Sequence, residues 1–383
     1  MINLSKLLFG NAEFEDPLRY GVKAHQKPII VWNLTRRCNL SCAHCYSDSK
    51  AKEYLGELST KEAKVVAEDL ASYEVPVVIF SGGEPLIRRD VFELAEHCRV
   101  LGLRVILSTN GTLISKNVAE KIKEVGFTYV GISLDGVREV NDRLRGVEGA
   151  FRLAVEGLKN CRDEGLKTGI RFTLTKRNYF EVERIFRLAK RLKVPRVCFY
   201  HLVYVGRGSG MVKEDLSHDE KRKIMDLIIS RTEDLTGRCI LSEVLTVDNY
   251  ADAVYLYLKL KERGDERAEI VYSLMRKHGG NSSGVGIAAI DSQGYVHPDQ
   301  FWTHYSLGNV KKRKFSEIWE DESEPLLKAL RMRKLFLKGR CSRCAFLELC
   351  NGNLRTRAEV TTGDIWAPDP ACYLTDKEIG IEY

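Results

Sequence analysis

The residues with the most distinctive chemistry in this 383-residue chain are two groups of closely spaced cysteines, one near each end. Cysteine thiolates are ligands of zinc and of iron–sulfur clusters, so both groups are candidate metal sites. The first group consists of Cys38, Cys42 and Cys45, and the second consists of Cys341, Cys344, Cys350 and Cys372.

The first group has the spacing C-x3-C-x2-C and comes directly after a short apolar run. Three thiolates leave one metal of a four-metal cluster without a protein ligand, and an open iron of that kind can chelate a small molecule. Two other interpretations stay open on the spacing alone, namely a zinc site completed by His44 and a redox-active thiol group.

The four thiolates of the second group are enough to close either an iron–sulfur cluster or a zinc site. On the spacing alone, zinc is the commoner choice. The remaining cysteines stand alone in the sequence, and we expect them to be small buried residues of the core. These are Cys98, Cys161, Cys198 and Cys239.

The composition excludes several classes of protein. A hydrophobic share of 44% and a charged share of 30% are typical of a globular chain. No apolar run approaches the roughly 20 residues that cross a bilayer, and the start carries no secretory signal, so we expect a cytoplasmic protein with no membrane partner. A net charge of +7 is too small to indicate a nucleic-acid partner. In a reducing compartment, eleven cysteines indicate thiols or metal ligands rather than disulfides.

After the first cysteine group, short apolar runs alternate with amphipathic helical patterns. Ser59 with Glu62 and Ser217 with Glu220 form capping boxes at two helix starts, and Ser115 begins another helix. Six strands joined by crossover helices predict an α/β fold, either a partial barrel or an open parallel sheet, with the active site at the carboxyl ends of the strands. The six predicted strands are 29–32, 77–80, 104–108, 129–134, 169–174 and 196–201.

The pattern changes twice toward the C-terminus. Residues 235–278 have a helical pattern, and from Gly279 the chain is rich in Gly and Ser, with a hairpin signal at Ser292-Gln293-Gly294. We therefore expect four units. They are an N-terminal segment at 1–27, a barrel at 28–234, a helical bridging segment at 235–278 and a smaller domain at 279–383.

The chain resembles the radical S-adenosylmethionine (SAM) superfamily, whose signature is C-x3-C-x-Φ-C after the first strand. Its further motifs match Gly82-Gly83-Glu84-Pro85, Ser108-Thr109-Asn110-Gly111 and Ser133-Leu134-Asp135-Gly136, each at the end of a predicted strand. The resemblance implies a partial (βα)6 radical SAM barrel in which the first cysteine group holds a [4Fe–4S] cluster that chelates SAM. It also implies a set of SAM-binding residues. These are His44, Gly82, Gly83, Glu84, Pro85, Ser108, Asn110, Ser133, Asp135 and Arg171.

The expected roles follow from residue chemistry and from the family. The paired glycines let the backbone approach a ligand, and Glu84 offers an acceptor for an ammonium group. His44 stands where the family usually has an aromatic residue near the adenine. Arg171 either reaches a carboxylate of SAM or of the substrate, or forms a structural ion pair. In the family, a reduced cluster passes one electron to SAM, and a 5′-deoxyadenosyl radical then abstracts a substrate hydrogen atom.

The C-terminal region resembles the SPASM domain, a module that carries auxiliary iron–sulfur clusters. A full module has additional cysteines and a second cluster, whereas this chain has Leu354 at one of those positions. The resemblance implies one auxiliary [4Fe–4S] cluster, held by the second cysteine group, that serves as an electron relay or a structural element. The expected cofactors are therefore SAM and two [4Fe–4S] clusters.

Longer stretches resemble the haem-biosynthesis branch of this superfamily. They include His297-Pro298-Asp299-Gln300-Phe301-Trp302 and the tail from Trp366 to Leu374. The resemblance implies removal of acetate side chains from 12,18-didecarboxysiroheme to give Fe-coproporphyrin III. The alternatives are an Fe-coproporphyrin III oxidative decarboxylase, a haem d1 side-chain-modifying enzyme and a SPASM-type peptide-modifying maturase. The short segment before the first strand disfavours the maturase.

An iron tetrapyrrole carries several carboxylates, which arginine binds through paired hydrogen bonds. His201, His278 and His297 are candidate axial ligands of its iron, although a buried histidine more often only satisfies hydrogen bonds. The expected partners are this substrate and a low-potential electron donor. Candidate carboxylate-binding arginines, most of them expected to be solvated, are Arg36, Arg37, Arg207 and Arg238.

Overall fold

The computed structural model describes residues 1–10, 16–20 and 27–381. Parts of the expected N-terminal segment 1–27, namely 11–15 and 21–26, lie outside the described residues. Within the described part, β1 (Ile2–Asn3) is an edge strand of the main sheet, and α1 (Leu4–Phe9) and α2 (Pro17–Tyr20) follow it.

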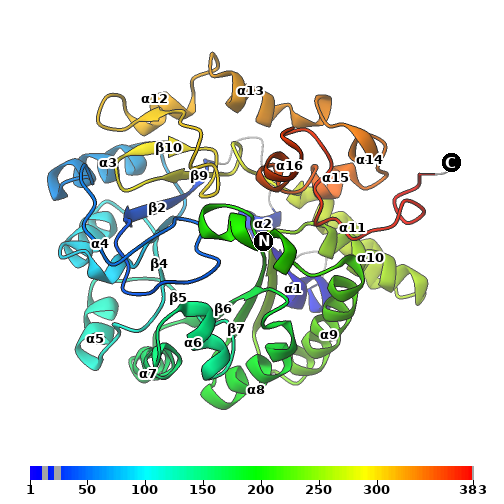
Figure 1. Ribbon diagram of the computed structural model, residues 1–383, viewed down its shortest axis with the longest axis horizontal. Helices are drawn as coiled ribbons and strands as arrows, with labels where there is room; N and C mark the ends of the chain where they lie inside the picture. Colours follow the sequence, from blue (N-terminus) through cyan, green and yellow to red (C-terminus); the bar gives the residue numbers. More distant parts are fainter. Residues whose placement is uncertain (11–15, 21–26, 382–383) are drawn as a thin grey trace.

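The sheet is built around consecutive parallel strands, each paired with the next along the chain. All six predicted strands are present, and the α/β prediction is confirmed. Figure 1 shows the strands as an inner arc, with helices around the outside of the arc. The parallel strands are β2 (Ile29–Thr35), β3 (Val78–Gly82), β4 (Val105–Thr109), β5 (Val130–Ser133), β6 (Thr168–Leu174), β7 (Arg196–His201) and β8 (Glu243–Val247).

The strand β8 corrects the sequence analysis, because it lies inside the stretch 235–278 that was expected to be helical. It pairs in parallel with β7, so that Val197 lies opposite Val244. The helices α10 (Ala251–Glu262) and α11 (Arg267–His278) follow it. The strand has only five residues and lies between two helical patterns. So short a run shows too little periodicity to distinguish a strand from the end of a helix.

The helices on the outer side begin largely where the sequence predicted. Both capping boxes form: Ser59 Oγ accepts from the Glu62 amide, and Ser217 Oγ accepts from the Glu220 amide. Each such cap contributes about 1 kcal/mol to helix stability. The helices are α3 (Thr60–Ser72), α4 (Val91–Val100), α5 (Lys116–Glu124), α6 (Glu139–Arg145), α7 (Ala150–Asp163), α8 (Val182–Leu192) and α9 (His218–Gly237).

The C-terminal region continues the same sheet. Strand β9 (Ile287–Ile290) pairs in parallel with β2, and β10 (Tyr295–His297) returns antiparallel to β9, which confirms the predicted hairpin. Strand β11 (Gly308–Asn309) completes the sheet. The helices that follow lie along the top of Figure 1. They are α12 (Phe315–Trp319), α13 (Pro325–Arg331), α14 (Gly339–Ser342), α15 (Leu347–Cys350) and α16 (Arg355–Thr362).

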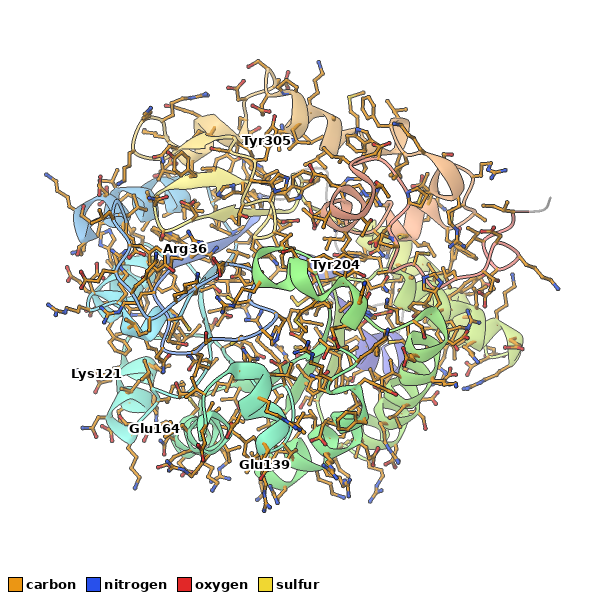
Figure 2. The ribbon with its side chains drawn as sticks, in the orientation of Figure 1. Arg36, Lys121, Glu139, Glu164, Tyr204 and Tyr305 are labelled. Atoms are coloured by element: carbon orange, nitrogen blue, oxygen red, sulfur yellow. The ribbon has the colours of Figure 1, made fainter. Side chains whose placement is uncertain are left out.

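The core packs between the strands and the outer helices, and charged residues such as Lys121 and Glu164 lie at the periphery (Figure 2). Cys98, Cys161 and Cys198 are buried, as predicted. Cys239 is exposed, so the prediction of a core residue was wrong there; its φ of 55° places it in the turn after α9. No helix in the described part of the chain is both long and apolar enough to cross a bilayer.

Candidate functional site

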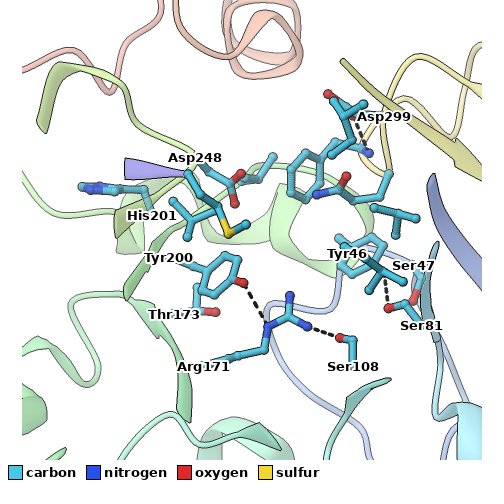
Figure 3. A pocket seen from close by; sticks show the side chains of 18 of the residues that line it. Tyr46, Ser47, Ser81, Ser108, Arg171, Thr173, Tyr200, His201, Asp248 and Asp299 are labelled. Carbon is cyan, nitrogen blue, oxygen red and sulfur yellow. Dashed lines mark hydrogen bonds between the residues drawn. The ribbon is translucent and has the colours of Figure 1, made fainter. Parts of the chain in front are cut away.

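A cavity of about 330 Å³ opens at the carboxyl ends of the parallel strands. Several consecutive strands each contribute lining side chains at this edge, among them a polar one, as expected for an α/β sheet. Figure 3 labels those from β3, β4, β6 and β7 and the one after β8, which lie around one space. The polar side chains are Ser81 from β3, Ser108 from β4, Ser133 from β5, Thr173 from β6, Tyr200 from β7 and Asp248 directly after β8.

The first cysteine group lines this cavity from the loop after β2. Its sulfur atoms face hydrogen-bond donors: the Leu40 amide lies 3.4 Å from Cys38 Sγ, and Arg145 Nη1 lies 3.6 Å from Cys42 Sγ. Burial raises the pKa of the Cys38 thiol to about 12 and also raises that of Cys42. A metal that binds thiolates would offset this penalty, because it favours the deprotonated form.

The three cysteines fit an iron–sulfur cluster better than a zinc ion. They are free thiols that share one cavity wall with donors aimed at their sulfurs. A zinc ion gathers its four ligands at about 2.0–2.3 Å from one point. No three Cys, His, Asp or Glu side chains of the described residues converge on such a point. The donor set therefore suits the more widely spaced ligands of a multi-iron cluster.

The 3-10 segment η4 (Gly206–Glu214) fastens the cysteine loop. Arg207 Nε donates to the Cys42 carbonyl at 2.7 Å, and its Nη1 donates to the Ser49 carbonyl at 2.8 Å. Arg207 thus holds the loop and does not line the cavity. The cavity is not lined by Arg36 (labelled in Figure 2), Arg37 or Arg238 either. The arginines that were expected to contact the substrate therefore lie outside the cavity wall.

The Gly-Gly-Glu-Pro segment packs against the start of the cysteine loop. A Cβ atom on Gly83 would lie 2.2 Å from the Arg37 carbonyl oxygen, so only glycine fits there. Both Gly82 and Gly83 line the cavity, whereas Glu84 and Pro85 lie behind it.

The expected role of Glu84 as an acceptor for a ligand's ammonium group needs correction. Its carboxylate is fully buried and accepts hydrogen bonds from Thr109 Oγ1 and the Asn110 amide, both at 2.7 Å. Glu84 therefore positions the end of β4, where Asn110 faces the cavity. Burial raises the pKa of Glu84 to about 7.

Asp135 also lies behind the cavity wall and supports two residues that line it. His44 Nε2 lies 3.0 Å from Asp135 Oδ2, and Arg145 Nη2 lies 2.6 Å from the same atom. Burial alone would raise the pKa of Asp135, but Arg145 and His44 lower it to about 2. The carboxylate therefore orients His44 and Arg145 toward the cavity.

Arg171 lies on β6 with its guanidinium group inside the cavity. It donates to Ser108 Oγ and, at 3.0 Å, to the hydroxyl of Tyr200 (Figure 3). Among the described residues no carboxylate lies within ion-pair distance of Arg171, which rules out the structural ion pair that the sequence left open. A partly buried guanidinium without a carboxylate partner suits an anionic ligand.

The cavity is also lined by residues that were not predicted from the sequence, namely Tyr46, Asp248 and Asp299. Tyr46 donates to Asn33 Oδ1 at 3.0 Å, and Asp248 and Asp299 lie across from Arg171 in Figure 3. Asp248 follows strand β8, which the sequence analysis missed. The sequence signal that could have identified Asp248 is the polar pair Asp248-Asn249 directly after the largely β-branched run 244–247. Asp299 lies within the stretch that carried the resemblance.

The candidate axial histidines separate into two kinds. His201 and His278 line the cavity, whereas His297 does not. His201 Nε2 lies 2.9 Å from Asp252 Oδ2. The Nδ1 atom of His297 faces the carbonyl of Tyr305 at 2.6 Å, which gives this histidine a structural role.

The second cysteine group forms a separate site. All four of its cysteines line one small pocket, whose walls include Val254, Phe346 and Leu374. Burial raises the pKa of all four thiols, that of Cys372 to about 11. Four soft donors around one small pocket suit an iron–sulfur cluster.

The second site is joined to the cavity wall through Gly280. A Cβ atom on Gly280 would lie 2.3 Å from the carbonyl oxygen of Cys350, and the Asn281 amide donates to that oxygen at 3.1 Å. Asn281 lines the cavity. The two sites therefore share a segment of backbone.

Comparison with known proteins agrees with these two sites. Residues 32–189 match the radical SAM superfamily, and residues 283–345 match the SPASM iron–sulfur cluster-binding domain. The chain is 52% identical to Fe-coproporphyrin III synthase of Methanosarcina barkeri, covering 99% of both chains. It is 46% identical to pre-heme d1 synthase of Dinoroseobacter shibae, covering 92% of this chain and 88% of that one.

Solved structures share the fold at lower identity. SuiB of Streptococcus suis, bound to its precursor peptide SuiA, has a TM-score of 0.72 at 18% identity, with 91% of this chain and 76% of that chain covered. The anSMEcpe structure with bound AdoMet and the Cp18Cys peptide has a TM-score of 0.68 at 21% identity, with 92% and 96% covered.

The two matched domains give the chain the cofactors SAM and two [4Fe–4S] clusters, as the two cysteine groups predicted. The chain belongs to the radical SAM enzymes that carry a C-terminal SPASM domain, in the haem-biosynthesis branch that includes Fe-coproporphyrin III synthase and pre-heme d1 synthase.

Proposed function

We propose that this enzyme removes the acetate side chains of 12,18-didecarboxysiroheme to give Fe-coproporphyrin III. The observation that carries the proposal is the 52% identity to an Fe-coproporphyrin III synthase over 99% of both chains. When bound, the cluster and SAM supply a radical that abstracts hydrogen from carbon. The residues of this chain bind and orient the reactants and keep water from the reacting centre.

The proposal assigns the first cluster to Cys38, Cys42 and Cys45, and the auxiliary cluster to the four C-terminal cysteines. It assigns SAM to the cavity wall beside the first group. Support comes from the shared cavity, which the three cysteines line together with His44, Gly82, Gly83, Ser108, Asn110, Ser133 and Arg171. Glu84, Pro85 and Asp135 take part only by positioning those residues.

An arginine without a carboxylate partner supports a substrate that carries carboxylates, whereas Arg19 and Arg145 are paired with Asp16 and Asp135. Arg19, Arg145 and Arg171 line the cavity, and Arg171 has no carboxylate partner among the described residues. Arginine binds carboxylates in a bidentate way that fixes their orientation. We propose that Arg171 anchors a carboxylate of SAM or of the tetrapyrrole.

We also propose an electron donor, a cellular compartment and domain boundaries for the enzyme. Radical SAM chemistry consumes an electron, so a low-potential electron donor is a required partner. A reducing, cytoplasmic setting is supported by the eleven free cysteines. The unit that holds the auxiliary cluster would begin near residue 279, and the radical SAM unit would extend beyond 234 to include β8.

The test is anaerobic incubation of the reconstituted enzyme with SAM, a reductant and 12,18-didecarboxysiroheme, read by mass spectrometry. Loss of two acetate side chains supports the proposal. The 46% identity to pre-heme d1 synthase makes formation of a haem d1 precursor the second candidate, and the product mass separates the two. Turnover of Fe-coproporphyrin III with loss of carboxyl groups would instead indicate the decarboxylase.

A further inference from the structure

We propose that Asp248 takes up a proton when substrate binds and donates a hydrogen bond from its carboxyl group to a carboxylate of the tetrapyrrole. The proposal rests on the proposed function, because it assumes a substrate with several carboxylates. The proton comes from solvent, and no covalent bond changes.

The position of Asp248 is that of a ligand-binding residue. It directly follows β8, at the same edge of the sheet as Ser108 and Tyr200, and it lines the cavity. Figure 3 shows its carboxylate on the wall opposite Ser108. Within the described chain, its carboxylate oxygens accept no hydrogen bond and form no ion pair. A partly buried carboxylate without a partner is costly unless a ligand completes it.

The backbone around Asp248 is held in an unfavourable conformation. Its φ is +65°, in the left-handed region that few residues other than glycine adopt. Arg357 Nη2 donates to the Asp248 carbonyl oxygen, and the same guanidinium group is neutralised by Asp369, 3.0 Å away. Arg357 therefore fixes the backbone of Asp248 through its carbonyl oxygen and forms an ion pair with Asp369. Strained residues of this kind concentrate at functional sites.

Burial is the main influence on the protonation of Asp248. The pKa of Asp248 is raised to about 6, chiefly by burial and also by the nearby Asp299. Arg357, the N-terminal ammonium group and His201 act in the opposite direction, and the neutral phenols of Tyr200 and Tyr250 face the same carboxyl group. A substrate carboxylate brought against Asp248 would raise its pKa again, because two neighbouring carboxylates share one proton.

On the wall that Asp248 lines, a substrate carboxylate would meet a carboxyl group rather than an arginine. Arg145 and Arg171 belong to the wall that carries the cysteine group and Ser108. Arg19 lines the cavity but is paired with Asp16 at 2.7 Å. A substrate with carboxylates around its rim cannot direct all of them to the guanidinium groups of one wall. Asp248 can accommodate one of the others only in its neutral form.

The experiment titrates the cluster-loaded enzyme, with SAM present, with Fe-coproporphyrin III under anaerobic conditions. The absorption of the tetrapyrrole reports affinity, and calorimetry in two buffers of different ionisation enthalpy counts protons. At pH 7 we expect uptake of up to one proton per tetrapyrrole. The dissociation constant should rise as the pH increases from 6 to 8, by up to about tenfold per unit when one proton is taken up.

The decisive variant is Asp248→Asn. Asparagine tolerates a positive φ and its amide donates a hydrogen bond at every pH, so affinity should stay within about threefold of the wild type at pH 7 while proton uptake and pH dependence disappear. Asp248→Gly keeps the backbone conformation and removes the donor, so it should lose both uptake and affinity. Asp364→Asn, at a partly exposed carboxylate paired with Lys338, should behave as the wild type.

Three results would overturn the proposal. Unchanged proton uptake in Asp248→Asn would overturn it while leaving the proposed function intact. A change of the iron's absorption spectrum on Asp248→Asn, without a change in proton uptake, would make Asp248 an iron ligand instead. Failure of the wild type to bind both Fe-coproporphyrin III and didecarboxysiroheme would overturn the proposed function, and this inference with it.

Discussion

The guanidinium group of Arg145 lies between a sulfur and a carboxylate, 3.6 Å from Cys42 Sγ and 2.6 Å from Asp135 Oδ2. Arg145 is the last residue of α6, so the fold brings it to the cysteine loop from far along the chain. Its charge serves both partners, since it stabilises the buried Asp135 carboxylate and donates to a sulfur of the proposed cluster.

Replacing Arg145 with methionine should therefore destabilise the folded protein. Removal of one partner from a buried ion pair lowers the free energy of unfolding by about 3–5 kcal/mol, which denaturant titration measures. The double variant Arg145→Met with Asp135→Asn should recover a large part of that loss. Arg162→Met, which removes an exposed partner of Asp163, should change stability by less than about 1 kcal/mol.

Iron content should follow the two cysteine groups. The wild type should bind about eight iron atoms per chain, from two four-iron clusters. Cys38→Ala should retain about four and abolish 5′-deoxyadenosine formation, and Cys344→Ala should also retain about four. The buried Cys161→Ala serves as the control and should retain all iron. Zinc at the C-terminal site of the anaerobically prepared protein would contradict the assignment of an auxiliary cluster.

Two neighbouring glycines, Gly279 and Gly280, provide a matched pair of variants that tests the segment joining the two sites. Gly279 and Gly280 both have positive φ, of 64° and 67°, but only a Cβ atom on Gly280 would collide with the Cys350 carbonyl. Gly279→Ala should lower the free energy of unfolding by about 1 kcal/mol, from backbone strain alone. Gly280→Ala should cost more and should also lower the occupancy of the auxiliary cluster. Equal iron contents in the two variants would contradict this coupling.

The C-terminal tail should loosen in acid. Glu378 receives two hydrogen bonds from Arg222 on α9, of 2.6 and 3.0 Å, and this pairing lowers the pKa of Glu378 to about 2. The folded state therefore gains stability above the ordinary carboxyl pKa and loses it as the pH falls toward 2. Glu378→Gln should lower stability by about 1 kcal/mol at pH 7 and by progressively less below pH 4.5, as measured by thermal unfolding. A constant difference across this range would contradict the ion pair.

Features that depend on neighbouring residues in the chain were predicted from the sequence better than the residues that line the cavity from distant loops. The capping serines, the six strands and the two cysteine groups all depend on residues close together in the chain. The contribution of Arg145 and Asp248 depends on which loop ends face the cavity, and that follows only from tertiary packing. Glu84 shows the converse: its motif was recognised, but its fully buried carboxylate serves neighbouring strands rather than a ligand.

The cationic residues illustrate the same limit. Arg36, Arg37, Arg207 and Arg238 were chosen because they lie in loops or at strand ends, yet Arg207 holds the cysteine loop by its carbonyls. Arg171 was identified because it lies within a strand with alternating polar residues. A position in a strand fixes the direction of a side chain, whereas a position in a loop does not.

The parallel pairing of β9 with β2 has a consequence for how the chain can be divided. Strand β2 would otherwise be the terminal strand of the barrel sheet, with unsatisfied amides and carbonyls along Ile29–Trp32, and β9 satisfies them. A fragment that ends before β9 would expose that edge to other molecules, and open edges of apolar strands promote aggregation. The auxiliary-cluster region thus also protects the radical SAM barrel from self-association, and an isolated barrel should be difficult to keep in solution.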